Sequence, residues 1–146
     1  LLYETALTAE RQGKPDVMEK HLRQLLKLKP DHAHALNALG YSLAERNIRL
    51  AEAQDLITRA LALAPQDPFI MDSMGWVQFR QGKLPEALKT LETAYGIKAD
   101  PEIAAHLGEV LWTMGRKDDA ARLLKDAAKK YPDNDVLAGA VKKFAP

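Results

Sequence analysis

A repeat dominates this sequence of 146 residues. Small residues of two kinds recur along it, and the distance from each to its equivalent in the next copy is 33 to 35 residues. The recurring sets are Gly40, Gly75 and Gly108, then Ala53, Ala87 and Ala120, then Ala60, Ala94 and Ala127. A fixed period in this range, with two helical patterns inside each copy, is typical of helical pairs stacked into an array. The repeat therefore predicts an all-α protein.

The repeated glycines and alanines are predicted to be packing residues. Two helices approach closely only where small side chains meet, because larger ones would separate the axes and open voids. We expect Gly40 and Gly75 to face small residues of the neighbouring helix. Those residues are Ala53, Ala60, Ala87 and Ala94. No catalytic role is predicted at these positions.

Apolar periodicity predicts two helices in each of four repeats and a ninth helix after them. The eight expected ranges are 1–12, 15–29, 33–46, 50–63, 68–81, 84–97, 101–114 and 117–131. Side-chain acceptors for the amides that open first helices are expected at Asp31, Asp67 and Asp100. Left-handed residues that end first helices are expected at Gly13, Gly82, Gly115 and Asn47, the last in a turn that is one residue longer.

The last stretch, residues 135–146, predicts a capping helix. Its apolar residues recur at one-turn spacing, with lysines on the other side. The apolar set is Val136, Leu137, Ala140, Val141 and Phe144, and the lysines are Lys142 and Lys143. Such a helix would cover the apolar face that the final repeat of an array leaves open.

Composition limits the function. Hydrophobic residues make up 47% and charged residues 28% of the chain, as in a globular domain, and no apolar stretch is long enough to cross a bilayer. A net charge of +1, from 21 basic and 20 acidic residues, argues against a nucleic-acid partner. The absence of cysteine excludes disulfides and thiol catalysis. No phosphate-binding loop or cofactor motif occurs, so no cofactor is predicted.

Two segments resemble tetratricopeptide repeats: ALNALGYSLAERNIRLAEAQDLITRALALAP and AHLGEVLWTMGRKDDAARLLKDAAKKYP. Each has a Leu-Gly pair in its first helix and a proline after its second, whereas the middle copy has Met74-Gly75 and Ala99 at these positions. The resemblance spans the whole chain. It implies one domain, a right-handed α-α superhelix with repeats at about 1–32, 33–67, 68–100 and 101–134 and a capping helix at 135–146.

First helices of the tetratricopeptide family line a concave groove, and the resemblance implies the same here. The groove residues would be His34, Asn37, Tyr41, Phe69, Asp72, Trp76, Phe79, Glu102, Glu109 and Trp112. Aromatic side chains supply contact area and carboxylates attract basic groups, so a protein or peptide with apolar anchors and positive charge is the expected partner. Tyr41, Asn37 and Asp72 are expected to be exposed. For Trp76, Phe79 and Trp112 the alternative is that they fill seams between helices.

One helix also raises the possibility of an enzyme. Glu102, His106 and Glu109 share a helix at spacings of four and three, which would suit a metal or proton-transfer site. No other repeat supplies a matching Glu and His motif, so we interpret His106 as a surface residue flanked by helix-stabilising acids. We therefore predict no catalytic residue and no metal ligand.

A closer resemblance concerns the segments ALNALGYSLAERN, DPFIMDSMGWVQFRQGKLPEAL and DPEIAAHLGEVLWTMGRKDDA. They are similar to the C-terminal repeats of long proteobacterial tetratricopeptide proteins, many of them lipoproteins on the periplasmic side of the outer membrane and including a protease adaptor. The resemblance implies a scaffold for a protease and its substrates, anchored by lipid outside this chain, with a cytoplasmic location as the alternative. The first residue is Leu1 and not methionine, so we expect a piece of a longer protein. A structural spacer, a self-association segment and a regulatory array of an enzyme remain alternative functions.

Overall fold

The computed structural model describes residues 2–146, and these residues form nine α-helices and no strand. The helices are α1 Leu2–Arg11, α2 Pro15–Leu28, α3 Ala33–Glu45, α4 Leu50–Leu63, α5 Pro68–Arg80, α6 Leu84–Ile97, α7 Pro101–Thr113, α8 Lys117–Lys130 and α9 Asp135–Phe144. The predicted all-α fold is confirmed, and helix ends lie within two residues of the expected ones. Residue 1, where the first helix was expected to begin, lies outside the described residues.

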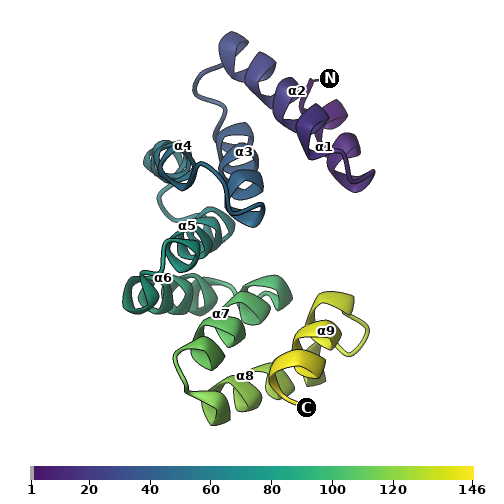
Figure 1. The fold of residues 1–146 in the computed structure, drawn as a ribbon, viewed down its shortest axis with the longest axis vertical. Coiled ribbons are helices and arrows are strands. Elements are labelled where there is room, and N and C mark those ends of the chain that lie inside the picture. Colours follow the sequence, from purple (N-terminus) through teal and green to yellow (C-terminus); the bar gives the residue numbers. More distant parts are fainter. Residues whose placement is uncertain (1) are drawn as a thin grey trace.

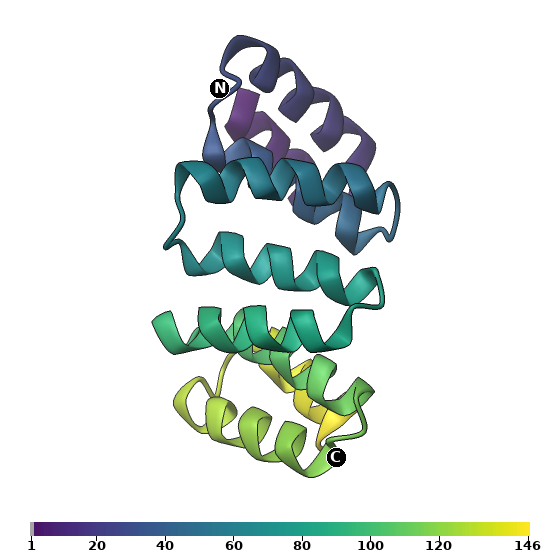
Figure 2. The ribbon, with the colours of Figure 1, turned by 90° about the vertical axis from the view of Figure 1, so that its left-hand side faces the viewer.

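The helices form successive antiparallel pairs that stack along an arc (Figure 1). The first helices α3, α5 and α7 lie on the inner, concave side, and their partners α4, α6 and α8 lie outside. Seen from the convex side, α4, α5 and α6 lie one above another (Figure 2). Helix α9 packs against both α7 and α8, which closes the C-terminal end of the arc. This arrangement is the predicted superhelix of helical pairs.

Side-chain caps open the first helices of the later repeats. The Asp67 and Asp100 carboxylates accept hydrogen bonds from the amides of the first turn of α5 and α7, as predicted. The prediction for Asp31 is wrong. Helix α3 begins at Ala33, so the residue directly before it is His32, whose Nδ1 accepts from the Ala35 amide at 3.0 Å. The histidine ring therefore replaces the carboxylate in the second repeat.

The turns inside the repeats use left-handed residues where these were expected. Gly13, Gly82, Gly115 and Asn47 all have positive φ angles. Arg49 also has a φ of 45° and was not foreseen. It lies in the longer turn between α3 and α4, where one additional residue must be accommodated before α4 begins.

The three repeated glycines face large side chains of the following helix. A Cβ atom on Gly75 would lie 2.6 Å from Cγ of Leu91, and one on Gly108 would lie 2.6 Å from Leu124. For Gly40 the nearest atoms belong to Ile57, with the Ala53 carbonyl oxygen at 3.1 Å. The close approach was predicted correctly. An alanine partner is found at Gly40, through the Ala53 backbone, whereas leucines take that place at Gly75 and Gly108. The repeated alanines are buried, as expected of packing residues.

A cluster of charged side chains fixes the first repeat to the second. The Glu19 carboxylate on α2 accepts hydrogen bonds from Arg23, Arg46 and Arg49 at 2.8 to 3.0 Å. Arg23 also donates two hydrogen bonds to Glu52 on α4. Burial alone would raise the pKa of Glu19, but the three arginines outweigh it and lower that pKa to about 2. The lowered pKa means that the cluster stabilises the fold above about pH 4.5 and loses this effect as the pH falls toward 2.

Replacing Glu19 by glutamine is expected to lower the free energy of unfolding by about 1 to 2 kcal/mol, because three arginines lose charge-assisted hydrogen bonds. Hydrogen exchange should accelerate in α1 and α2 more than in α7 and α8. Glu92→Gln, on the exposed side of α6, provides the control and should leave both quantities unchanged. Equal hydrogen-exchange rates in α1 and α2 of the two variants would show that the charged cluster does not stabilise the first repeat.

Candidate functional site

The concave side contains two adjoining pockets that share the Tyr41 side chain, which also lines a third pocket between α1, α2 and α3. The large pocket, of about 550 Å³, is lined by Tyr41, Glu45, Trp76, Ala105, His106, Glu109, Val136, Gly139, Ala140, Lys142, Lys143 and Phe144. The small pocket, of about 200 Å³, is lined by Glu10, Asn37, Ala38, Tyr41, Phe69, Asp72, Ser73 and Glu102. First helices therefore supply most of the lining, and α9 supplies one side of the large pocket.

A polar network of three side chains from three successive first helices lies where the pockets meet. Nδ1 of His106 lies 2.9 and 3.0 Å from the two carboxylate oxygens of Asp72. Nε2 of the same ring lies 3.3 Å from the Tyr41 hydroxyl oxygen. Because a carboxylate only accepts, the Asp72 contact places a proton on Nδ1, and the Tyr41 hydroxyl donates to Nε2 when the ring is neutral. The network ties α3, α5 and α7 together beneath the groove.

Trp76 supports this network from one face of the histidine. Its ring stacks on His106 with centroids 4.3 Å apart and on Phe79 at 4.9 Å. Its Nε1 donates to the Glu45 carboxylate at 3.0 Å, and the Arg80 guanidinium lies 5.0 Å from the ring centroid. Because of these contacts, Trp76 is only 4% exposed. It forms a fixed floor for the large pocket.

Electrostatics in the network favour the protonated form of His106. Burial lowers the pKa of His106, but the hydrogen bond to Asp72 and the negative charges of Asp72, Glu45 and Glu102 outweigh burial and raise it overall. Burial also raises the pKa of Tyr41, and the neighbouring carboxylates of Glu45 and Asp72 raise it further. The tyrosine therefore stays a neutral hydroxyl group.

This raised pKa predicts a pH dependence of stability. A histidine that binds its proton more tightly in the folded chain adds stability that is complete below about pH 6.5 and disappears as the pH rises through the folded pKa. The free energy of unfolding should therefore fall when the pH is raised from 6 to 9. His106→Gln should show a smaller fall in urea denaturation at the same pH values. Identical pH profiles for the two chains would contradict the assignment.

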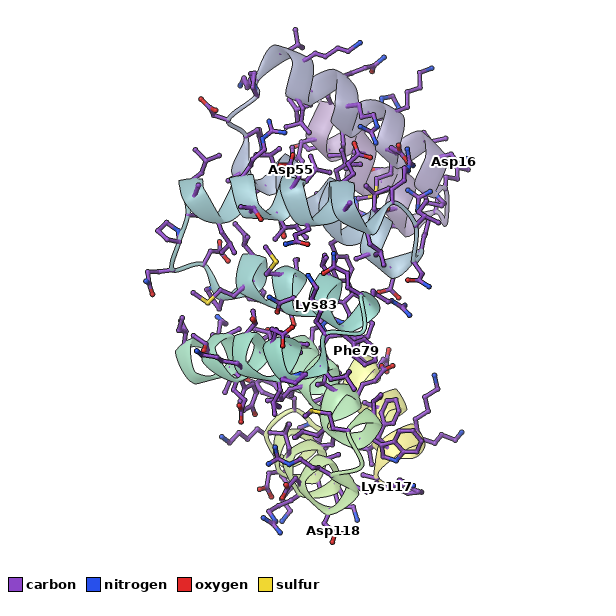
Figure 3. All side chains as sticks on the ribbon, turned by 60° about the vertical axis from the view of Figure 1, so that its left-hand side comes forward. Asp16, Asp55, Phe79, Lys83, Lys117 and Asp118 are labelled. Atoms are coloured by element: carbon purple, nitrogen blue, oxygen red, sulfur yellow. The ribbon has the colours of Figure 1, made fainter. Side chains whose placement is uncertain are left out.

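The structure separates the ten residues that were predicted to line the groove. Those that line a pocket are Asn37, Tyr41, Phe69, Asp72, Trp76, Glu102 and Glu109. Those that line neither pocket are His34, Phe79 and Trp112. Phe79 is partly buried and stacks on Trp76, so it fills a seam. Trp112 is 37% exposed at the end of the solenoid, where it contacts Phe144 and lies under the Lys117 ammonium, labelled in Figure 3.

Two predictions about exposure are wrong, those for Asp72 and His106. Asp72 is 6% exposed because its carboxylate turns inward to His106. Trp76 follows the seam alternative, since its ring is buried between His106, Phe79 and Arg80. The His106 side chain is 15% exposed and forms the centre of the polar network, so it is not a surface histidine.

Sequence reasoning also missed several pocket residues. Glu45 lies one helical turn after Tyr41 on the same stripe, so the spacing of four that identified the other groove residues would have found it. No comparable spacing in the sequence indicated the other pocket residues, which include Glu10, Val136, Lys142 and Lys143. Val136 was expected to be covered with the rest of the apolar face of α9, but it is 48% exposed because that helix turns this residue toward the large pocket.

The described residues offer little for metal chemistry. Within residues 2–146 no three histidine or acidic side chains are grouped to hold a metal ion, and Glu102 and Glu109 line different pockets on either side of His106. No helix in the same range has the length and apolar character needed to cross a membrane.

The paired helices, their period and the groove on the first helices define a helical-repeat scaffold. Two models of the tetratricopeptide repeat match residues 3–68 and 78–143, which together include most of the chain. This chain belongs to the tetratricopeptide repeat family. It is also 50% identical over 109 residues to the TPR repeat-containing protein PA4667 of Pseudomonas aeruginosa, a match that covers 75% of this chain. The matched segment spans 18% of the length of that relative.

Solved structures share the fold. The tetratricopeptide protein TTC0263 of Thermus thermophilus superposes with a TM-score of 0.83 at 23% identity, over 96% of this chain and 79% of its own. The O-GlcNAc transferase of Thermobaculum terrenum gives a TM-score of 0.81 at 25% identity, over 89% of this chain but 25% of the transferase. MamA from Desulfovibrio magneticus gives 0.74 at 18% identity, over 92% of this chain and 76% of MamA.

Proposed function

We propose that this chain is a non-catalytic interaction segment that binds an extended part of a protein partner along its concave side. The observation that carries the proposal is the pair of adjoining pockets over a hydrogen-bonded network of Tyr41, His106 and Asp72. A binding surface that is already ordered loses little entropy on association, which favours affinity. Tetratricopeptide repeats in general act as scaffolds for protein interaction, and the family membership supports the same role here.

Charged groups on the walls of the groove support a polar partner. Glu109 and Lys142 line the large pocket, and neither makes an ion pair with another residue in the range 2–146. Unpaired charges of both signs on one surface orient a partner and accelerate encounter. Val136 and Phe144 add apolar contact area on the α9 side.

A finer proposal follows from the resemblance of the three quoted segments to proteobacterial lipoprotein repeats. On that basis we propose that the parent protein works in the periplasm, attached to the outer membrane through lipid, and presents substrates to a protease. The high identity to a Pseudomonas tetratricopeptide protein is consistent with a bacterial scaffold of this kind. Identification of the bound partner tests the proposal.

Site-specific photocrosslinking in the parent protein and its native cells tests the interaction surface. Phe69 and Glu109 are the positions to replace by a photoreactive residue, because both face the groove and neither belongs to the polar network. Glu92, exposed on α6, is the matched position outside the groove. Capture of one protein from both groove positions and not from Glu92 supports the proposal, and a captured protease supports its finer form.

Two other outcomes of the crosslinking would contradict the proposed function. Capture of a second copy of the parent alone would favour the self-association alternative. Equal capture from Glu92 and the groove positions would show that the concave side is not the binding surface.

A further inference from the structure

The small pocket has a composition that distinguishes it from the rest of the groove. We propose that it receives the side chain of an arginine or lysine from the partner, an inference that rests on the proposed binding function. Three carboxylates line this pocket, those of Glu10, Asp72 and Glu102, and no basic residue does. The large pocket differs because two lysines line it together with two glutamates. A cation is therefore the chemical complement of the small pocket alone.

Two acceptor groups of the small pocket are open to such a cation. They are the exposed carboxylates of Glu10 and Glu102, which make no ion pair within the described residues. Oδ1 of Asn37 also has no hydrogen-bond partner in the same range, but it is buried, so a cation would reach it only after that side chain turned. The pocket's hydroxyl groups are engaged elsewhere, since Ser73 donates to the Phe69 carbonyl and Tyr41 contacts His106. A guanidinium or ammonium group, which only donates, would satisfy these acceptors.

The aromatic rings and the volume of the small pocket also favour a single cationic side chain. The rings of Tyr41 and Phe69 line the pocket, Phe69 is 44% exposed, and the face of an aromatic ring attracts a cation. The Phe69 ring already has the Lys98 ammonium 5.8 Å from its centroid. A volume of about 200 Å³ is below the range of about 300 to 1,000 Å³ typical of small-molecule sites, so one side chain is the appropriate occupant.

The acids of the pocket have different roles. Asp72 is held by His106, so part of its charge is compensated inside the network. Glu10 and Glu102 remain as the exposed carboxylates that would meet the incoming cation. These two residues are suitable for substitution because neither contributes to the core.

Titration with N-acetyl-L-arginine amide, followed by two-dimensional NMR of the chain, tests the pocket directly. We expect saturable shift changes in the Asn37 side-chain amide and in the backbone around Phe69 and Glu102. N-acetyl-L-citrulline amide has nearly the same shape without the charge. We expect its affinity to be about one fifth of that of the arginine amide, or lower. Equal affinity for the two probes, or changes that do not saturate, would overturn the inference.

Glutamine variants test which carboxylates attract the arginine amide. Glu10→Gln and Glu102→Gln should each weaken arginine-amide binding by about threefold, whereas Glu109→Gln in the large pocket should not. Unchanged binding in both small-pocket variants would also overturn the inference. Failure here would leave the proposed function standing if the groove positions still crosslink a partner. Absence of groove-specific crosslinking would instead reject the function itself.

Discussion

Replacing Gly75 by leucine is expected to lower the free energy of unfolding by about 3 kcal/mol or more. Even a Cβ atom at this position would lie 2.6 Å from Cγ of Leu91, and that leucine is fully buried among other core residues. Relief requires α5 and α6 to separate, which opens voids along the whole seam. Urea denaturation followed by circular dichroism at 222 nm measures the loss.

Gly96→Leu is the matched control. Gly96 lies in α6, and a Cβ atom added there would have no neighbouring atom within 4 Å, so the same substitution meets open space. Because glycine destabilises a helix interior by roughly 0.5 to 1 kcal/mol, this variant should be as stable as the parent or slightly more stable. Equal destabilisation of the two variants would mean that helix approach in this fold does not depend on the repeated glycine.

Replacing His106 by leucine is expected to destabilise the chain by about 3 kcal/mol. The substitution removes the only side chain that the Asp72 carboxylate contacts by a hydrogen bond within residues 2–146, and leaves a nearly buried charge without a partner. It also removes the ring on which Trp76 stacks. Thermal and urea unfolding should both report the loss, together with a changed tryptophan fluorescence spectrum.

Two further variants separate the network from general effects of the substitution. His34→Leu changes an exposed histidine on α3 and should alter stability by less than about 0.5 kcal/mol. Adding Asp72→Leu to His106→Leu should recover part of the stability, because the unpaired charge is then gone. A double variant less stable than His106→Leu alone would argue that Asp72 is stabilised by groups other than His106.

Helix α9 has two roles that are connected by its position. Leu137 and Ala140 are buried against the last repeat, which is the expected work of a cap. The same helix turns Val136 and its lysines toward the large pocket. The end of the array is therefore also a wall of the candidate binding surface, and it supplies the two lysines that line the large pocket.

The repeat made the fold predictable because its signals are local. A glycine or alanine at a fixed period identifies a helix seam, and Asp67 or Gly82 identifies a helix end, whatever the rest of the chain does. The polar network was not predictable in the same way. His106 lies 34 residues from Asp72 and 65 from Tyr41, so its burial depends on how repeats are rotated against one another. Spacing within one helix made it look like a surface residue.

The same limit explains the errors in the groove. Trp76 and Asp72 line the pockets as predicted, but both are buried, because their side chains contact His106 of the next repeat. Spacing within one helix does not reveal such contacts between repeats. Phe69 and Glu102 were predicted correctly as groove residues, since both are exposed and both line the small pocket.

The central claim is that the concave side is the surface that binds a partner. The most direct test is to add a peptide copied from the crosslinked region of that partner to the isotope-labelled chain and to map the NMR shift changes. We expect changes on α3, α5, α7 and the pocket side of α9, around Asn37, Glu102 and Glu109. Changes confined to the outer helices α4, α6 and α8 would contradict the claim.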